Sequence, residues 1–331
     1  MELFWLAIST ILIGVFGCVA WFWGSNWVLD RIYPPRGPDA GDNIRKASQI
    51  RPWLFLGPAI LFLGVYLVYP IFDSLWRSLH NAGGTEFVGL SNYAWHMGDD
   101  NFRTSIRNNL VWLLVVPALS TLFGLIAAQL TDRLKWGNIG KSLIFMPMAI
   151  SFVGAGVIWK FIYEYRAPDE NQIGLLNAIV QALGGDPQLW LTLIPWNNFF
   201  LMIVLVWIQT GFAMVILSAA LRGIPEETIE AAILDGASPW QVFFKIKVPQ
   251  IMGTIAVVWT TITIVVLKVF DIVFVMTNGQ WGTQVLANLM YDWMFRGTPD
   301  YGRGSAIAII LMALVTPIMI WNIVNARREV R

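Results

Sequence analysis

Long apolar runs alternate with short polar segments along almost the whole chain. Seven of these runs reach the roughly 20 helical residues that a bilayer core of about 30 Å requires. Apolar segments of this length cross membranes as helices, because a helix satisfies its own backbone hydrogen bonds. The pattern predicts an all-α polytopic membrane protein with about seven transmembrane helices, at 3 to 23, 53 to 72, 109 to 130, 142 to 163, 199 to 221, 253 to 276 and 305 to 325.

The orientation of these spans follows from the Lys and Arg residues, which are retained preferentially on the cytoplasmic side. The first span is expected to be retained, because no basic segment precedes it and no small-residue cleavage site follows it. The chain is predicted to have its N-terminus outside and its C-terminus in the cytoplasm. The inner segments 24 to 52, 131 to 141, 222 to 252 and 326 to 331 then hold 14 Lys and Arg, against 6 in the outer loops.

Composition narrows the classes of protein further. The chain is 56% hydrophobic and 13% charged, whereas ordinary soluble domains carry about a quarter charged residues, so the composition argues against a water-soluble fold of this size. A formal net charge of +1 without a basic tract argues against nucleic acid as a partner. The single cysteine, Cys18, excludes a disulfide within the chain.

The inner segment 222 to 252 carries the strongest local signals. Pro225 suits the first turn of a helix, and Glu226 stabilises the positive N-terminal end of that helix. Asp235 and Gly236 then favour a sharp bend. A second helix is predicted from about Pro239 to Ile246, and Pro249 is expected to stop it before the next span. The segment is therefore predicted to be a compact helix-turn-helix.

Within this segment, Glu230, Ala231 and Ala232 are followed after three residues by Gly236. After nine more residues come Ile246, Lys247, Val248 and Pro249. This spacing resembles the EAA loop shared by the binding-protein-dependent permeases of bacterial ABC importers. The resemblance covers 53 to 331. Over this range the chain is similar to the maltose-type sugar permeases, with alpha-glucoside permeases as the nearest subgroup. It implies an ABC importer type I permease fold in the bacterial inner membrane.

In that family the loop docks into a cleft on an ATPase subunit. Glu230 would pair with a basic residue of the partner, and the two alanines would allow close approach. Phe243, Phe244 and Ile246 would supply apolar anchors, since buried aromatic side chains carry much of an interface's energy. The coupling residues expected from the resemblance are Glu230, Ala231, Ala232, Asp235, Gly236, Phe243, Ile246 and Pro249.

The resemblance also implies the partners and the division of the chain. A second permease subunit, two ATPase subunits and an extracytoplasmic sugar-binding protein would complete the importer. ATP and magnesium would be bound by the ATPase subunits, and this chain would hold no cofactor and would not be an enzyme. Residues 1 to 52 would form an N-terminal transmembrane helix and cytoplasmic linker, and 53 to 331 the permease domain, with its core at about 105 to 325.

Two outer segments agree with the maltose-type resemblance. Residues 87 to 110 look like the segment that precedes the core spans of those permeases. Phe270 and Asp271, followed by 277 to 279, resemble the segment after their corresponding span. The family usually continues there with Gly-Gly-Pro, whereas this chain reads Gly279, Gln280 and Trp281, which leaves the shape of that loop open.

Lys268 and Asp271 are charged residues inside the sixth predicted span. Each would cost about 2.5 to 3.5 kcal/mol if it faced lipid, so both are expected to face protein or water. At three residues apart on one helix they would share a face and neutralise each other. Two interpretations stay open: a structural ion pair, or residues that line a translocation path or gate.

Four further residues are candidates for the substrate path. Trp207 and Gln209 lie in the middle of the fifth predicted span, too deep for an interfacial belt. An aromatic ring stacks on sugar faces and an amide binds hydroxyls, although core packing explains the same residues. By counting from nearby prolines, the resemblance places Trp207, Met148 and Phe152 at sugar-contacting positions, where Met148 and Phe152 lack the family's polar groups.

Other chemistries find less support. Gly140, Lys141 and Ser142 lack the first glycine and the preceding strand of a phosphate-binding loop. His80 and His96 lack metal-ligand spacing, and no catalytic constellation is recognisable. The alternatives that stay open are an ion-coupled secondary transporter or channel that uses Lys268 and Asp271, and an ABC permease for another solute such as glycerol phosphate.

Overall fold

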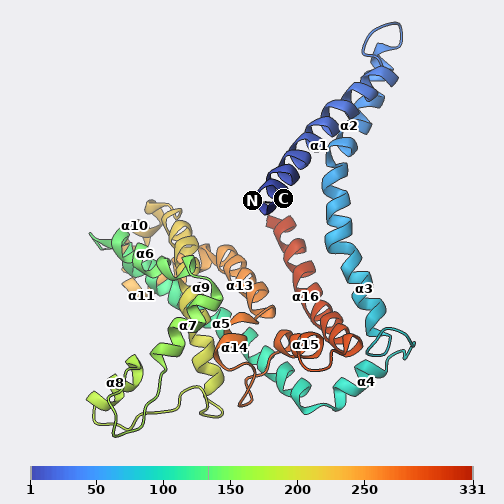
Figure 1. Cartoon of the computed structure of the whole chain (residues 1–331). Coiled ribbons are helices and arrows are strands. Elements are labelled where there is room, and N and C mark those ends of the chain that lie inside the picture. The colour runs from blue at the N-terminus through green and yellow to red at the C-terminus, as the bar shows by residue number, and fades with distance from the viewer. Residues whose placement is uncertain (1, 133, 330–331) are drawn as a thin grey trace. The chain divides into compact units, whose positions relative to one another are not determined.

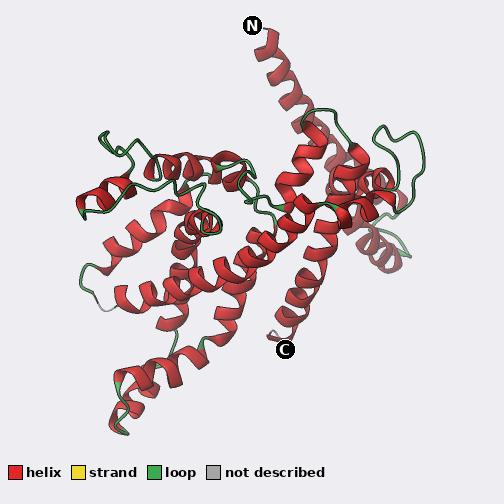
Figure 2. Ribbon diagram, turned by 90° about the horizontal axis from the view of Figure 1, so that it is seen from below, coloured by secondary structure: helices red, strands yellow, loops and turns green. Residues whose placement is uncertain are grey.

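The computed structural model describes residues 2–132 and 134–329, and the regular elements among them are all helices (Figures 1 and 2). The all-α prediction is therefore confirmed. Five helices are long and apolar enough to cross a membrane, or up to seven if two bent helix pairs each count as one span. Contacts divide the chain into two units, up to Asp73 and from Ser74. The sequence-based boundary at residue 52 instead marks where the family resemblance begins.

The first unit is a helical hairpin. Helix α1 (Glu2–Ile32) is followed by α2 (Ala40–Leu63), which continues through the π-helical turn Gly64–Val68 into α3 (Tyr69–Ser78). The boundary between the two units falls within α3, after Asp73. The Trp21 indole donates to the carbonyl of Leu54 at 3.0 Å and joins the two arms. Their ends are further held by the Arg51–Asp30 ion pair at 2.6 Å. The predicted span 53 to 72 is thus the middle of a longer helix.

Two π-helical stretches each precede a proline inside a continuing helix. Gly64–Val68 lies before Pro70, and Val242–Lys247 lies before Pro249. A proline lacks the N–H that would bond the carbonyl four residues earlier, and its ring clashes with that carbonyl. A π turn at this place widens the helix, so the chain passes the proline without ending. The expectation that Pro249 stops the second loop helix is therefore wrong, because α12 (Val248–Gln250) contains it and the bend comes at Ile251.

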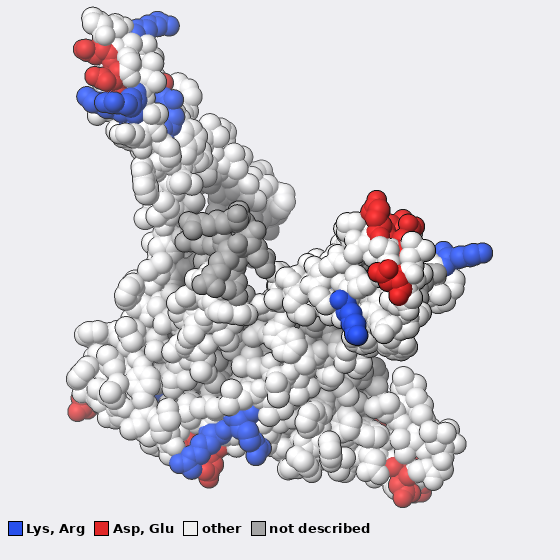
Figure 3. All heavy atoms as spheres, turned by 180° about the vertical axis from the view of Figure 1, so that it is seen from behind, with Lys and Arg blue, Asp and Glu red and all other residues white. Residues whose placement is uncertain are grey.

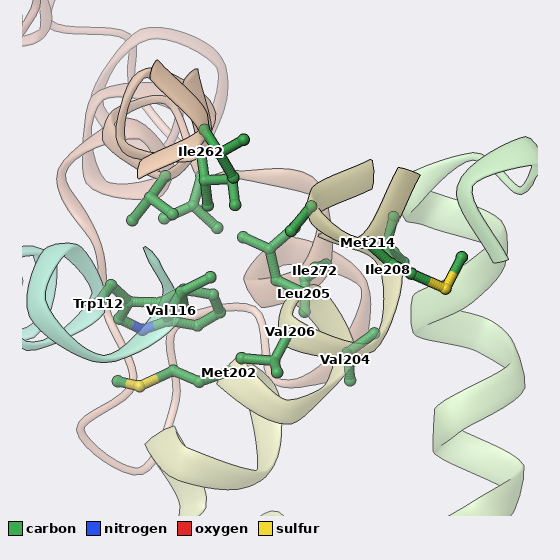
Figure 4. Packing of buried hydrophobic residues seen from close by; sticks show 14 of the residues in the cluster. Trp112, Val116, Met202, Val204, Leu205, Val206, Ile208, Met214, Ile262 and Ile272 are labelled. Carbon is green, nitrogen blue, oxygen red and sulfur yellow. The ribbon is translucent and has the colours of Figure 1, made fainter. Parts of the chain in front are cut away.

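The core of the second unit forms between α5 (Asp100–Thr131) and α9 (Asn197–Arg222), with α13 (Met252–Leu267) beside them. Figure 4 shows Trp112 and Val116 of α5 facing Met202 of α9 across the packed interior. The two long helices approach closely because α5 carries Gly124, where a Cβ would lie 2.4 Å from the Ala213 Cβ. Small residues at such crossings are typical of membrane helices.

The predicted span 142 to 163 is not one continuous helix, because the chain is bent there by 106°. Helix α6 (Gly137–Phe145) and a 3₁₀ turn, Met146–Ala149, precede α7 (Phe152–Ile162). Pro147 lies in the turn, and the Ser151 hydroxyl caps α7 by accepting the Gly154 N–H at 3.1 Å. Helix α6 in turn packs on α9, where a Cβ on Gly211 would meet the Ile144 carbonyl at 2.6 Å.

The sixth predicted span, 253 to 276, is also interrupted. Helix α13 ends at Leu267, residues 268 to 270 are not helical, and α14 (Asp271–Met276) follows. The pair formed by Pro239–Gln250 and Met252–Leu267 is bent by 69°. The other helices of the unit are α4 (Ser91–Gly98), α8 (Leu175–Ala182), α10 (Glu226–Leu234), α11 (Pro239–Gln241), α15 (Leu286–Phe295) and α16 (Tyr301–Glu329).

Candidate functional site

Residues 222 to 252, called the coupling loop below, form the predicted helix-turn-helix. Helix α10 ends in a Schellman motif, in which the Ala237 N–H bonds the Ala232 carbonyl and the Gly236 N–H bonds the Ile233 carbonyl, both at 3.0 Å. This ending needs a left-handed residue, and Gly236 supplies it with φ +82°. The bend at Gly236 is confirmed.

The second half of the coupling loop begins with a capping box. The Ser238 hydroxyl accepts the Gln241 N–H, and the Gln241 side chain accepts the Ser238 N–H at 2.7 Å. One turn further on, the Trp240 and Phe244 rings stack with centroids 5.7 Å apart. Both rings are largely exposed, as is Leu234 at 88%. The loop thus presents a rigid apolar surface that nothing else in the described chain covers.

The predicted coupling residues divide into exposed and buried ones. Glu230, Ala231, Asp235, Gly236 and Pro249 are exposed. Ala232 is only 9% exposed, so it packs inside the chain. Of the two alanines, Ala231 is the one exposed for the expected close approach of a partner. Phe243 and Ile246 are half-buried, and Phe243 packs against the main core.

The large apolar side chains exposed on the coupling loop include Leu234, Trp240 and Phe244, and sequence reasoning singled out only Phe244 among these three. The signal for Trp240 was its position four residues before Phe244 on a helix. The exposed side chains of Glu226, Glu227 and Glu230 give α10 a negative charge, and Figure 3 shows red side chains gathered over α10. A partner surface that combines an apolar pocket with basic residues fits this arrangement.

A pocket of about 260 Å³ lies where α13 is interrupted. It is lined by residues from α7, α9, α13 and α14, namely Phe152, Leu205, Val265, Lys268, Val269, Phe270, Asp271 and Ile272. We call it the Lys268 pocket. It brings together three residues predicted for the substrate path: Phe152, Lys268 and Asp271. Its wall is mainly apolar, with one ammonium and one carboxylate group.

The helix break changes the interpretation of these two charges. The break separates Lys268 from Asp271, so they do not share a face of one helix as predicted. The two are not joined by any ion pair found among the described residues. Asp271 instead begins α14, where a carboxylate is stabilised by the helix N-terminus. The predicted structural ion pair is therefore not formed between these two residues, and the interpretation that they line a path stays a prediction.

Lys268 and Phe270 also line a second cavity, of about 520 Å³, on the side of α15 and α16. Its wall includes Tyr291 and Thr316 among mostly apolar residues. Because the two cavities share Lys268 and Phe270, the non-helical segment 268 to 270 forms the partition between them.

The remaining predicted path residues lie outside the Lys268 pocket. Trp207 is half-buried and meets Trp159 of α7 edge to face, with ring centroids 5.7 Å apart. Gln209 is only 7% exposed, whereas Met148 in the 3₁₀ turn is 43% exposed. For Trp207, packing against α7 accounts for its position as well as a ligand would.

The outer loop after α14, whose shape the sequence left open, is tightly folded. Asn278, Gly279, Trp281 and Gly282 all have positive φ. Buried amides hold the loop to the two core helices. Asn108 of α5 donates to the Gly282 and Gln284 carbonyls at 2.8 Å, and Asn197 of α9 donates to the Trp281 carbonyl at 2.8 Å. These amides were missed by sequence reasoning.

A charged cluster connects the coupling loop with α5 and α6. Asp132 follows α5, Lys141 lies in α6, and Ser218 and Arg222 lie in the last turns of α9; we call these four the Asp132 cluster. Lys141 pairs with the Asp132 carboxylate and donates to the Ser218 hydroxyl at 2.7 Å. Ser218 and Arg222 donate to Asp132 at 3.0 and 2.9 Å.

The pKa of Asp132 reflects these contacts. Burial raises the pKa of the carboxyl group, but the hydrogen bonds from Lys141, Arg222 and Ser218 outweigh burial and lower it below its ordinary value. Asp132 is therefore charged at neutral pH. Lys141, which the sequence did not connect with any partner, is bound to this charge.

The two histidines have structural contacts. His80 Nδ1 lies 2.7 Å from the Trp76 carbonyl, and His96 Nε2 lies 3.0 Å from the Arg303 carbonyl. Burial lowers the pKa of His96 despite that hydrogen bond. Within the described ranges, no group of three or more His, Cys, Asp or Glu residues is arranged to hold a metal ion.

Comparison with known proteins gives a consistent picture. The family described as binding-protein-dependent transport system inner membrane component matches residues 120–330. The alpha-glucoside transport system permease protein of Rhizobium meliloti (strain 1021) is 70% identical over 332 residues, covering 99% of both chains. The osmoprotective compounds uptake permease protein of Synechocystis is 51% identical over 82% of this chain and 96% of its own.

A crystal structure of a bacterial ABC transporter involved in the import of the acidic polysaccharide alginate contains a similar chain. The TM-score is 0.72, with 20% sequence identity and coverage of 86% of this chain and 99% of the other. At this identity the likeness concerns the fold alone, and it confirms the predicted ABC importer permease fold.

Proposed function

The chain belongs to the family of binding-protein-dependent transport system inner membrane components, and on this premise we propose that it is the permease subunit of an ATP-driven importer of an alpha-glucoside. The observation that carries the proposal is the 70% identity with the alpha-glucoside permease protein of Rhizobium meliloti along the whole chain. Relatives named for trehalose and maltose, from Thermococcus litoralis, and for lactose, from Rhizobium radiobacter, are 31% and 28% identical and support a sugar as cargo.

Four further components complete the proposed importer. A second permease subunit shares the pore, two ATPase subunits bind ATP and magnesium, and an extracytoplasmic binding protein delivers the sugar. The exposed Leu234, Trp240 and Phe244 support an ATPase contact at the coupling loop, because aromatic anchors of this kind dominate protein interfaces. The chain itself holds no nucleotide in this proposal.

The proposed mechanism is alternating access. Closure of the ATPase subunits moves the coupling loop, and the pore opens toward the outer side, with the N-terminus outside and the C-terminus in the cytoplasm. The Lys268 pocket supports a solute path through the second unit, since it combines an apolar wall with an ammonium and a carboxylate that can bind hydroxyl groups. Trp207, Gln209 and Met148 would contribute only if the pore rearranges around them.

The decisive experiment is reconstitution of the complete complex in proteoliposomes, with the binding protein inside or outside the vesicles as orientation requires. We expect alpha-glucosides to stimulate ATP hydrolysis and to be taken up, and unrelated monosaccharides to do neither. The chain reconstituted alone is the control and should move no sugar. Ion-driven sugar flux through the chain alone would contradict the proposal and favour a secondary transporter.

The cargo has one specific competitor. The relative that is 51% identical is named for osmoprotective compounds. The same proteoliposome assay should therefore include a charged and an uncharged osmolyte glycoside, together with a glycerol phosphate ester. Stimulation of ATP hydrolysis by these compounds and not by alpha-glucosides would replace the cargo while leaving the permease function intact.

A further inference from the structure

The Asp132 cluster lies between two parts of the chain that the proposed mechanism must connect. Arg222 is the last residue of α9, and only residues 223 to 225 separate it from α10 of the coupling loop. Lys141 lies in α6, which leads through the 3₁₀ turn to α7, and the first residue of α7, Phe152, lines the Lys268 pocket. The cluster is thus the place where the coupling loop and the pocket-lining elements share charged contacts.

The contacts within the cluster differ in their exposure to water. The Ser218 residue is 3% exposed, and the side chains of Lys141 and Asp132 are 15% and 21% exposed. The Arg222 side chain is 60% exposed, so water screens its contact with Asp132 much more. The partly buried Lys141–Asp132–Ser218 contact is therefore the persistent one, and the Arg222 contact is the one that a moving loop can break and remake.

We propose that Asp132 is a positioning residue that transmits displacement of the coupling loop to α6 and α7, and through them to the Lys268 pocket. The inference rests on the proposed function, because it presumes that an ATPase moves the loop. One carboxylate bonds to groups on both α6 and α9, so displacement of either helix changes the position of the other. A second contact, between Gly211 of α9 and the Ile144 carbonyl near the end of α6, keeps the helices packed there when the carboxylate is removed, so the loss of Asp132 frees only the part of α6 that carries Lys141.

The first test is Asp132→Asn in the complete reconstituted complex. The amide keeps the size of the side chain and removes its charge, so Lys141 and Arg222 lose their common partner. We expect the number of sugar molecules transported per ATP hydrolysed to fall about fivefold or more, as a lost coupling free energy between two sites predicts. Asp132→Glu, which restores the charge, should recover most of this ratio.

Two further variants separate transmission from simple stabilisation. Asp100→Asn removes another carboxylate of α5, from an exposed ion pair with Arg103, and should leave the ratio unchanged. Combining Asp132→Asn with Lys141→Met should lower the ratio no further than Asp132→Asn alone, because residues acting through one contact are not additive. Parallel losses of transport and ATP hydrolysis at an unchanged ratio would mean a structural role and overturn the proposal.

The second test needs no transported sugar, which keeps it separate from the proposed function. Spin labels on Ile139→Cys in α6 and Ala219→Cys in α9, in a Cys18→Ser background, report the distance between the two helices. With Asp132 present, ATP trapping should leave this distance unchanged, and with Asp132→Asn it should change. Equal behaviour of the two proteins would overturn the inference, even if the wild-type complex transports an unexpected solute or none.

Discussion

Gly236 shows how one residue prepares the coupling loop for a partner. Its φ of +82° costs any other L residue about 1 to 2 kcal/mol, while an added Cβ there meets no atom within 4 Å. We expect Gly236→Trp to insert and fold, because the chain has room for the side chain, but to lose most ATPase association. Co-purification of the ATPase subunit and sugar uptake measure the two effects.

The matched control for that substitution is Gly184→Trp. Gly184 has φ +80° and equally open surroundings, but it follows α8, far along the chain from the coupling loop. The backbone strain is therefore the same in both variants. If Gly184→Trp also abolished ATPase association, strain and not the blocked surface would be the cause.

The lowered pKa of Asp132 predicts how the stability of the folded chain depends on pH. Its lowered pKa means that the folded state binds the proton less tightly than the unfolded state does. The contribution of the charged carboxylate to the free energy of unfolding is therefore fully present above the ordinary pKa of 3.8, and it disappears as pH falls through the lowered pKa. At neutral pH, Asp132→Asn should cost about 2 kcal/mol, as for one hydrogen bond to a charged group. Thermal unfolding in detergent should show the difference between the two proteins narrowing below pH 4.

At the scale of elements, the sequence predicted what local residues determine. The bend of the coupling loop follows from Pro225, Gly236 and Pro239, each of which acts on its own backbone. The break at 146 to 151 had a visible signal in Pro147, but the apolar run around it was long enough to suggest one span. The break at 268 to 270 contains no proline or glycine, so only packing in the folded chain reveals it.

Among the site residues too, local sequence predicted some features, and packing in the folded chain determined the others. Ala232 and Phe243 occur in a segment that the motif places at the surface, yet Ala232 is only 9% exposed and Phe243 packs against the core of the second unit. The packing of Phe243 depends on a core that residues far along the chain, such as Trp112, help to form, and no local pattern records it. Lys268, by contrast, was identifiable because a charge in an apolar run is costly unless it faces protein or water.

The exposed, stacked rings of Trp240 and Phe244 allow the role of the coupling loop in ATPase binding to be tested separately from stability. Both rings are more than half exposed, so Trp240→Ala should leave the melting temperature of the isolated chain unchanged. The affinity for the ATPase subunit should fall by tenfold or more, as for an aromatic hot spot of about 2 kcal/mol. Titration of detergent-solubilised chain with the ATPase subunit measures the affinity.

Trp196→Ala is the matched control for that experiment. Trp196 is also exposed, at 58%, and also contacts a phenylalanine, Phe199, with ring centroids 5.8 Å apart. It precedes α9 at the opposite end from the coupling loop. A similar loss of affinity in both variants would show that the assay detects general damage rather than the interface.

At the scale of the whole molecule, the question is whether Lys268 stabilises the fold or serves the path. Lys268 lies in a pocket wall and has no ion pair among the described residues, so Lys268→Met breaks no salt bridge and adds no charge to the span. Lys268→Met should therefore leave expression, assembly and unfolding temperature unchanged. Sugar uptake should fall at least about tenfold, because a hydrogen bond of about 1.4 kcal/mol or more to the cargo is lost.

Lys160→Met provides the comparison, since Lys160 also lies in a bent span, in α7, and is exposed. Its ammonium donates to the Val275 carbonyl at 3.4 Å, and it is not among the described residues that line the Lys268 pocket. Uptake should therefore persist in Lys160→Met. If Lys268→Met instead lowered stability while the few folded molecules transported sugar normally, the interrupted helix would be a structural feature of the fold, and the path through the second unit would have to avoid it.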